Sequence, residues 1–588
     1  MRQRKNWWKN IVMKPENLDK YVIGLDYGTL SARAVLVCVG SGEVIAESVY
    51  PYPNGIYTNG IYPNRMHPVR MYPHETNSHR ILDNLPETEM KLPVDFALQE
   101  IDDYVEVMYH TIGEVVEKSG CRPENVIGIG IDATSSTFLP VLANGEPLCK
   151  TERFRTNPHA WLKLWKHHGA QKEADCITEL AKKRNEKFLM RCGGRVNAEW
   201  MLPKLMEIVR KAPDVYEMTD NFMEVSDYLV YLLTGEVTRC MCHAGYKLLW
   251  NEEDGYPSED FLKELHPGLS NLKVKLKGRE VQVGECAGRL TQEAARRMGL
   301  KAGTAVAASM IDAHVAVPSA GIDGSEKALM ILGTSCCMLL CSEKLSYIQG
   351  ISGCVKNAVL PGLYAYEAGQ SAVGDLFDWF VKTSVPGSYE KEAADLGISV
   401  HTLLSEKAAH LAPGESGLIA LDWWNGNRSC LADSKLSGMI LGFTLRTKPE
   451  DIYRALLEAT AFGMRAIFEE FEKGGIIAKE LYACGGIVSK NPFMMQIYAD
   501  ILGKTILTSS TNQGSAFGAS IYAAVAAGND AGGYLSVGEA ARAMGNIGEK
   551  KYDPIPCNVE AYNMLYKEYK ILHNYFGSGG NEVMHRLK

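Results

Sequence analysis

Two segments of the sequence share one pattern, in which an apolar strand, a short polar turn and a second apolar strand follow each other. The first is YVIGLDYGTLSARAVLVCV at residues 21–39, and the second is ALMILGTSCCMLL at residues 328–340. Each predicts a β-hairpin that carries polar groups at its tip. Because the hairpins lie in opposite halves of the 588-residue chain, we expect one type of domain that occurs twice.

The length of the chain supports two domains, since 588 residues exceed what a single hydrophobic core usually serves. A cleft between the two domains is then expected. The hydrophobic fraction of 46% and the charged fraction of 22% are typical of a globular protein. A formal net charge of -8 provides no broad positive field, which argues against nucleic acid or an anionic membrane as a partner. Small molecules are the expected ligands.

The cysteines and the amino terminus indicate a cytoplasmic protein. The 15 cysteines show no repeated spacing of the kind that marks a disulfide scaffold, so we expect reduced thiols. No apolar run has the length of a signal peptide core or of a membrane span. Residues 1–20 are expected to be an amino-terminal extension. The segment 50–93, rich in Tyr, Pro and Asn, is expected to be an irregular excursion on the surface.

Two further apolar runs end in an aspartate. VIGIGID ends at Asp132, just before the hydroxyl cluster ATSST, and TAVAASMI is followed by Asp312. Each predicts a buried strand that places polar groups at one edge of a sheet. A helix over 447–473 is predicted to begin with a capping box of Thr447 and Glu450. We divide the chain into a first domain at 21–312 and a second domain at 313–588.

The first hairpin tip has the groups that a phosphate needs. Phosphoryl transfer requires a cradle for the phosphates, a cation that neutralises them and a base that takes the proton of the acceptor. Gly28 lets the backbone approach an anion, Thr29 and Ser31 can donate hydrogen bonds, and Arg33 adds positive charge. Asp26 is the expected Mg²⁺ residue, acting through water, because Mg²⁺ retains part of its hydration shell. The same residues also fit a plain β-hairpin turn.

The second tip and a later glycine loop extend this set. Gly333, Thr334 and Ser335 offer backbone amides and hydroxyls to the far side of the same phosphates. In YACGGIVSKN, a strand runs into Gly485 and Gly486, which allow close approach to a flat ligand, and Asn491 begins the next helix. Each motif alone is also compatible with a simple turn. Their order along the chain is what favours a nucleotide site.

From Tyr21 to about Gly577, this ordered set resembles the nucleotide site of the actin, hexokinase and heat-shock chaperone superfamily, and in detail that of the FGGY carbohydrate kinases. The resemblance implies an α/β fold with two actin-like ATPase (ribonuclease H-like) domains and a cleft between them. The carboxyl-terminal signature of the family is met only approximately, because Phe443 stands where a smaller aliphatic residue is usual. Six segments resemble, in order, the members that phosphorylate ribulose: IGIDATSST, NPHAWLKLWKHH, AGYKLLW, IDAHVAVPSAG, YEAGQSAVGDLFDWF and LDWWNGNR.

The resemblance also implies roles for individual residues. Asp312 is the expected general base, and it also contacts the sugar. Lys247, Glu367 and the region of Ser135 are expected to hold the sugar hydroxyls, and Trp165 is expected to form an apolar wall. Asp422, Trp424, Asn425 and Arg428 are expected to lie along the interface between the domains.

The expected reaction transfers a phosphoryl group from MgATP to L-ribulose in the use of arabinose. A kinase for D-ribulose or for another pentulose or pentitol is an alternative, because only the sugar contacts distinguish such enzymes. An actin-like or chaperone-like binding module that ATP switches, with no sugar substrate, is an alternative of another class. A homodimer is the default oligomeric expectation.

Overall fold

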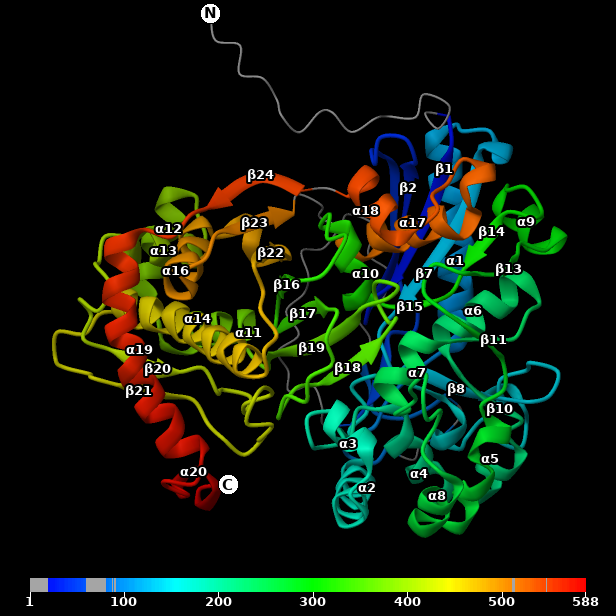
Figure 1. Cartoon of the computed structure of the whole chain (residues 1–588), viewed down its shortest axis with the longest axis horizontal. Coiled ribbons are helices and arrows are strands. Elements are labelled where there is room, and N and C mark those ends of the chain that lie inside the picture. The colour runs from blue at the N-terminus through cyan, green and yellow to red at the C-terminus, as the bar shows by residue number, and fades with distance from the viewer. Residues whose placement is uncertain (1–18, 60–80, 87, 89–90, 510–512, 546) are drawn as a thin grey trace, which may run out of the picture.

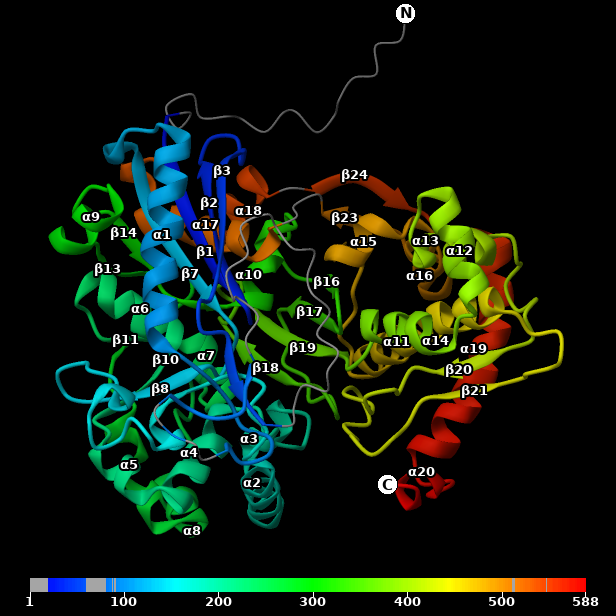
Figure 2. The same ribbon diagram turned by 180° about the vertical axis from the view of Figure 1, so that it is seen from behind.

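The chain folds into two α/β lobes that lie side by side, as Figures 1 and 2 show from opposite sides. The computed structural model describes residues 19–59, 81–86, 88, 91–509, 513–545 and 547–588. Most of the expected extension at residues 1–20 is therefore outside the described residues. Each lobe is built around its own seven-stranded sheet. The two-lobed α/β architecture expected from the sequence is thus confirmed.

The first sheet contains the first predicted hairpin, and its order is β13-β14-β7-β1-β2-β3, with β15 paired to β7. β1 runs antiparallel to β2 and parallel to β7, so that Asp26 lies opposite Arg33 on one side and opposite Asp132 on the other. The strands are β1 (Tyr21–Tyr27), β2 (Ser31–Cys38), β3 (Val44–Pro51), β7 (Val126–Ala133), β13 (Cys286–Arg289), β14 (Ala305–Ala307) and β15 (Met310–Ile311).

The seven-stranded sheet of the second lobe repeats this plan in the order β18-β19-β17-β16-β22-β23-β24. β16 runs antiparallel to β17 and parallel to β22, just as β1 pairs with β2 and β7. The similarity of the two hairpin patterns therefore extends to the strands beside them. The strands are β16 (Lys327–Leu332), β17 (Cys336–Ser342), β18 (Gly353–Lys356), β19 (Tyr364–Gln370), β22 (Glu480–Cys484), β23 (Ile506–Ser509) and β24 (Ile547–Tyr552).

A late part of the chain returns to the first lobe. Helices α17 (Gly514–Ala527) and α18 (Val537–Met544) are drawn in orange beside the blue strands of the first sheet in Figure 1. α17 packs closely because two strand glycines face it. A Cβ at Gly24 would lie 1.7 Å from the carbonyl oxygen of Ala516, and one at Gly130 would lie 2.1 Å from that of Ala519. The division of the chain at residue 312 stays a prediction.

The described ends of the segment 50–93 are not an irregular surface excursion, so this expectation was wrong for them. β4 (Ile56–Thr58) belongs to a six-stranded sheet, and the side chains of Tyr52 and Ile56 are fully buried. Tyr52 stacks on Tyr104 with 4.8 Å between the ring centroids. The Tyr-rich composition therefore supplied core side chains here. Residues 60–80, in the middle of the segment, lie outside the described part of the chain.

The six-stranded sheet that contains β4 also belongs to the first lobe, and its order is β10-β8-β9-β6-β4-β5. Its other strands are β5 (Ile81–Leu82), β6 (Ala97–Gln99), β8 (Phe138–Val141), β9 (Leu162–Lys163) and β10 (Asn221–Glu224). Two small sheets pair β11 (Thr238–Cys240) with β12 (Arg279–Val281), and β20 (Ile419–Leu421) with β21 (Met439–Leu441).

Helices cover the sheets of both lobes (Figure 2). The predicted long helix is α14 (Pro449–Lys473), and its first amides are capped one residue later than expected, because Asp451 accepts from the backbone N–H of Lys448. No helix in the described residues is long and apolar enough to span a membrane. The remaining α-helices are α1 (Ile101–Ser119), α2 (Gln171–Arg184), α3 (Lys187–Arg191), α4 (Met201–Lys211), α5 (Pro213–Met218), α6 (Val225–Thr234), α7 (Met241–Lys247), α8 (Glu259–Leu265), α9 (Gln292–Met298), α10 (Asp312–Ser319), α11 (Gly374–Ser384), α12 (Gly387–Leu396), α13 (Val400–Ala409), α15 (Gly486–Lys490), α16 (Pro492–Leu502), α19 (Pro556–Gly577) and α20 (Val583–Arg586).

Candidate active site

Three carboxylates meet where three neighbouring strands of the first sheet end. Asp26 on β1 lies opposite Asp132 on β7, and Asp312 directly follows β15, whose Met310 also lies opposite Asp132. Asp132 is fully buried, and neither oxygen of its carboxylate has a hydrogen-bond partner among the described residues. Burial raises the pKa of Asp132 well above its ordinary value, and the charges of Asp26 and Asp312 raise it further. The strand register therefore concentrates negative charge at one point.

This cluster of carboxylates fits a divalent cation held through water. Arg33 approaches it, with its Nε 3.5 Å from the carboxylate of Asp26, but one guanidinium leaves three carboxylates short of positive charge. An unpaired buried carboxylate such as Asp132 is costly unless a cation or a proton neutralises it. In the described residues no three side chains of His, Cys, Asp or Glu are placed to ligate one metal ion directly. Mg²⁺ prefers oxygen ligands and retains several waters, which suits such a site.

Asp312 connects this cluster to a second group of charges. Its carboxylate accepts a hydrogen bond of 2.7 Å from the N–H of Ala313 at the start of α10. Burial, and next the charge of Asp26, raise the pKa of Asp312 to about 7. In the second group, the charge of Glu367 raises this pKa and the charge of Lys247 lowers it. Asp312 therefore links the carboxylate cluster to Glu367 and Lys247.

Glu367, in the middle of β19, is held by three basic side chains. Its carboxylate lies 3.8 Å from Lys247 Nζ on α7, 3.2 Å from His314 Nε2 on α10 and 3.2 Å from a terminal nitrogen of Arg428. Burial alone would raise the pKa of Glu367, but Lys247, the bond to His314 and Arg428 together hold it well below its ordinary value. Cys242 Sγ lies 3.3 Å from the other ring nitrogen of His314. Glu367 is thus kept ionised and fixed in place.

The tip of the first hairpin is fixed from several sides. The N–H of Gly28 donates to the carbonyl of Ser31 at 3.0 Å, which closes the turn. The indole N–H of Trp165 donates to the Thr29 hydroxyl at 3.2 Å, and the Tyr52 hydroxyl donates to the carbonyl of Gly28 at 2.9 Å. The predicted phosphate loop and the predicted sugar wall are therefore in direct contact.

The second hairpin tip lies against the first turn of α11. The N–H of Gly333 donates to the carbonyl of Ser335 at 2.9 Å, and the N–H groups of Gly374 and Asp375 donate to the carbonyls of Gly333 and Thr334. The first N–H groups of α11 are therefore taken up by the carbonyls of the tip. The start of the helix thus fixes this tip in place.

The glycine loop follows β22, the neighbour of β16. Gly485 has a φ of +108°, and a Cβ there would lie 2.3 Å from the carbonyl oxygen of Leu332. Gly486 has open space where its side chain would be. Asn491 begins α16 as expected, because its side chain accepts from the N–H of Met494 at 3.0 Å. The loop therefore lies beside the end of the second hairpin.

Some residues of the site were missed or misplaced by sequence reasoning. Asp132 was recognised only as a strand end, and His314 and Lys204 were not singled out, because both are buried residues within helices. Of the four residues placed along the domain interface, Arg428 reaches Glu367. Asp422 instead accepts hydrogen bonds from Gln370 and Tyr569 inside the second lobe.

Comparisons with known proteins assign the chain to a family. Residues 86–318 match the N-terminal domain of the FGGY family of carbohydrate kinases, and residues 328–527 match its C-terminal domain. The chain belongs to the FGGY family of carbohydrate kinases. It is therefore an ATP-dependent sugar kinase, as the resemblance of its motifs implied. Phosphoryl transfer from ATP to a sugar is the chemistry of such a kinase.

Curated relatives of this FGGY kinase include ribulokinases. That of Geobacillus thermodenitrificans is 49% identical over 571 residues, which cover 97% of each chain, and that of Staphylococcus aureus strain MW2 is 41% identical over 565 residues, covering 96% of this chain and 98% of that protein.

Solved structures confirm the fold. The xylulose kinase from Rhodospirillum rubrum has a TM-score of 0.72 at 22% identity and covers 94% of this chain and 98% of its own. The gluconate kinase from Lactobacillus acidophilus has a TM-score of 0.74 at 17% identity and covers 95% of this chain and 99% of its own.

Proposed function

We propose that this FGGY kinase transfers the γ-phosphoryl group of MgATP to L-ribulose and releases ADP and L-ribulose 5-phosphate, in a pathway that consumes arabinose. Relatives that align over nearly the whole chain are named ribulokinases, which supports ribulose as the acceptor. The observation that carries the proposed chemistry is the position of Asp312, which interacts with Asp26 on one side and with Glu367 and Lys247 on the other.

In this proposal Asp312 is the general base. The sugar hydroxyl oxygen forms a bond to the γ-phosphorus, the bond to the bridging oxygen of ADP breaks, and the hydroxyl proton moves to the Asp312 carboxylate. A base whose pKa lies near the operating pH suits this task. The pKa of Asp312, raised to about 7 mainly by burial, therefore fits the role.

The two hairpin tips are proposed to hold the phosphates. Gly28, Thr29, Ser31 and Arg33 act from the first lobe, and the tip at 333–335 acts from the second. The glycine loop, with Gly485, Gly486 and Asn491, is assigned to the adenosine. Asp26 is proposed to hold Mg²⁺ through water, with Asp132 contributing charge. Mg²⁺, when bound, neutralises the β- and γ-phosphates. Closure of the lobes would exclude water as a competing acceptor.

The sugar is proposed to bind between Glu367, Lys247, Trp165 and the turn that contains Ser135. A polyol needs charged donors and acceptors in fixed positions, and the side chains of Lys247, His314 and Arg428 hold the Glu367 carboxylate in one place. Trp165 offers a flat apolar face. D-ribulose and other pentuloses or pentitols remain alternative acceptors. A homodimer and a cytoplasmic location remain predictions from the sequence.

Release of ADP, measured across a set of acceptors, tests this assignment. The set is L-ribulose, D-ribulose, D-xylulose, ribitol and glycerol, each at several concentrations with saturating MgATP. We expect the highest kcat/KM with L-ribulose, and little ATP turnover without sugar. A higher kcat/KM with another acceptor would reassign the substrate. ATP turnover that no sugar stimulates would contradict the proposed function.

A further inference from the structure

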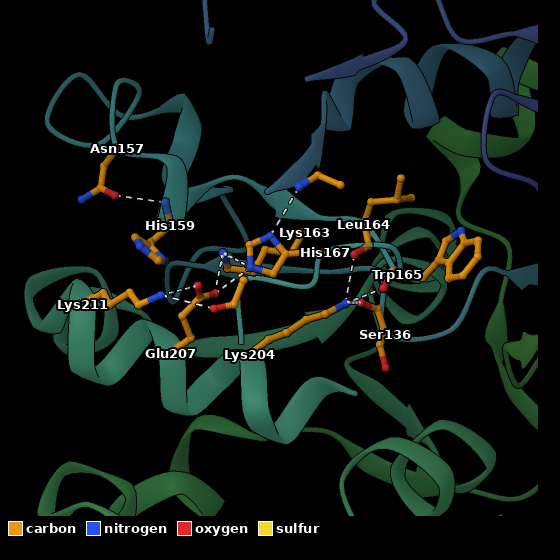
Figure 3. A network of polar contacts seen from close by, with 12 residues as sticks. Ser136, Asn157, His159, Lys163, Leu164, Trp165, His167, Lys204, Glu207 and Lys211 are labelled. Atoms are coloured by element: carbon orange, nitrogen blue, oxygen red, sulfur yellow. Dashed lines mark hydrogen bonds and ion pairs between the residues drawn. The ribbon is translucent and has the colours of Figure 1, made fainter. Parts of the chain in front are cut away.

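Lys204, in the first turn of α4, has a completely buried side chain that ends among main-chain carbonyls. Its Nζ donates to the carbonyl oxygens of Ser136 at 3.0 Å, Leu164 at 2.9 Å and Trp165 at 3.2 Å, and Figure 3 shows these three contacts converging on the ammonium group. A lysine ammonium has three N–H donors, so every donor of Lys204 has an acceptor.

These carbonyls belong to two segments that border the proposed sugar site. One is the turn after β7, where Ser136 directly follows Ser135 and has a φ of +56°, in the left-handed region that non-glycine residues seldom adopt. The other runs from β9 to Trp165, whose own N–H donates to the Thr137 hydroxyl at 3.2 Å. Lys204 thus joins the Ser135 turn to the tryptophan wall.

The surrounding charges show why a lysine is needed at this position. Glu207, one turn further along α4, is fully buried and is engaged by Lys163 at 3.3 Å, His167 at 2.7 Å and Lys211 at 3.0 Å (Figure 3). No carboxylate in the described residues lies within 4.0 Å of Lys204 Nζ, the limit for an ion pair. A methionine would fill similar volume without the cost of burying a charge. The three carbonyls are therefore the direct partners of Lys204, while Glu199, Glu224 and Glu207 act on its charge from further away.

We propose that Lys204 is a positioning residue for the sugar: it fixes the Ser135 turn and Trp165 relative to each other, and so sets the shape of the sugar-binding wall. The inference rests on the proposed function in one respect, namely that this wall contacts the acceptor sugar. Lys204 itself touches neither substrate, because its donors are all occupied by the backbone.

The replacement Lys204→Met tests the proposal, because it retains the length of the side chain and removes its three donors. Displacement of a binding group by about 1 Å is enough to cost up to about 10² in rate. We expect the KM for the sugar to rise at least tenfold, which corresponds to about 1.4 kcal/mol, while the KM for MgATP changes less than about threefold. A purely structural role would lower kcat through loss of folded enzyme and leave both KM values unchanged.

Arg239→Met is the matched control. Arg239 is another buried cation of the same lobe that donates to main-chain carbonyls, those of Phe222 and Lys277, and neither belongs to the proposed sugar site. We expect this variant to lose thermal stability without a change in the KM for the sugar. A rise in the sugar KM equal to that of Lys204→Met would show that any loss of stability in this lobe weakens sugar binding, and would overturn the proposal.

Hydrogen exchange, measured without sugar, separates this inference from the substrate assignment. In Lys204→Met the amides of residues 134–138 and 163–167 should exchange faster, whereas those of the second lobe should be unchanged. Faster exchange throughout the chain, or none in these two segments, would contradict the positioning role. If the wild-type enzyme prefers another sugar, the kinetic test is made with that sugar. The assignment of L-ribulose can then be wrong while the positioning role of Lys204 is still supported.

Discussion

The function of single residues in this kinase depends on how their charges are compensated. Glu367 is buried, yet its carboxylate stays ionised because Lys247, His314 and Arg428 surround it. His314 has a pKa lowered by its burial, so the imidazole is neutral and donates one N–H to Glu367. The neighbouring Cys242 thiol then faces the nitrogen that accepts. One ionised acceptor in a fixed position is what a polyol hydroxyl requires.

This arrangement predicts an acid-sensitive contribution to stability. Because the pKa of Glu367 in the folded protein lies well below its ordinary value of 4.5, its contribution is present above about pH 4.5 and is lost as the pH falls below that value. The loss should be about 1.4 kcal/mol for each pH unit. In urea unfolding between pH 7 and pH 3.5, the stability gap between the wild-type enzyme and Glu367→Gln should therefore shrink.

The exposed Glu124, in the 3₁₀ turn Pro123–Asn125 that precedes β7, provides a control for this measurement. The gap between the wild-type enzyme and Glu124→Gln should stay the same across the pH range. A gap for Glu367→Gln that is constant, or that widens in acid, would contradict the charge arrangement described for β19.

At the scale of elements, the sequence predicted what local patterns determine. Both hairpins, the strand that contains Asp132 and helix α14 follow from the spacing of apolar residues, whereas the run before Asp312, predicted as one strand, is divided into β14 and β15. The Tyr-rich ends of the segment 50–93 were misjudged, because composition does not reveal that Tyr52 will stack on Tyr104. The return of α17 to the first sheet depends on contacts between residues far apart in the chain, which no local pattern contains.

The packing of α17 gives a prediction for this scale. A methyl group at Gly24 would lie 1.7 Å from the carbonyl oxygen of Ala516, so Gly24→Ala must displace the helix or the strand. We expect the free energy of unfolding to fall by at least about 1–3 kcal/mol, the usual cost of overpacking. Urea unfolding of the purified variant measures this loss.

Gly113, inside α1, is the matched control because a Cβ there would have no neighbour within 4 Å. Gly113→Ala should stabilise the protein by about 0.5–1 kcal/mol, since alanine is the better helix former. Equal effects of the two replacements would show that α17 does not pack against β1 as described.

At the scale of the whole molecule, the site needs both lobes. The first lobe supplies Asp26, Asp132 and Lys247, and the second supplies Glu367 and Arg428. Backbone contacts join the lobes near the sugar side, where the N–H of Gly350 donates to the carbonyl of Gly193 at 2.8 Å. The order of motifs predicted that they would converge, but the sequence could not show that buried basic residues such as Lys204 and His314 would support them. Those contacts depend on how helices pack across the lobe.

Turnover of Asp312→Asn is the decisive measurement, since proton removal is assigned to this carboxylate at the junction of the two groups of charges. In a single-turnover experiment with saturating MgATP and sugar, the rate of sugar phosphate formation should fall by about 10² to 10⁴, while the thermal midpoint and the affinity for the nucleotide should stay close to those of the wild-type enzyme. Phosphorylation at the wild-type rate by a folded Asp312→Asn enzyme would contradict this assignment.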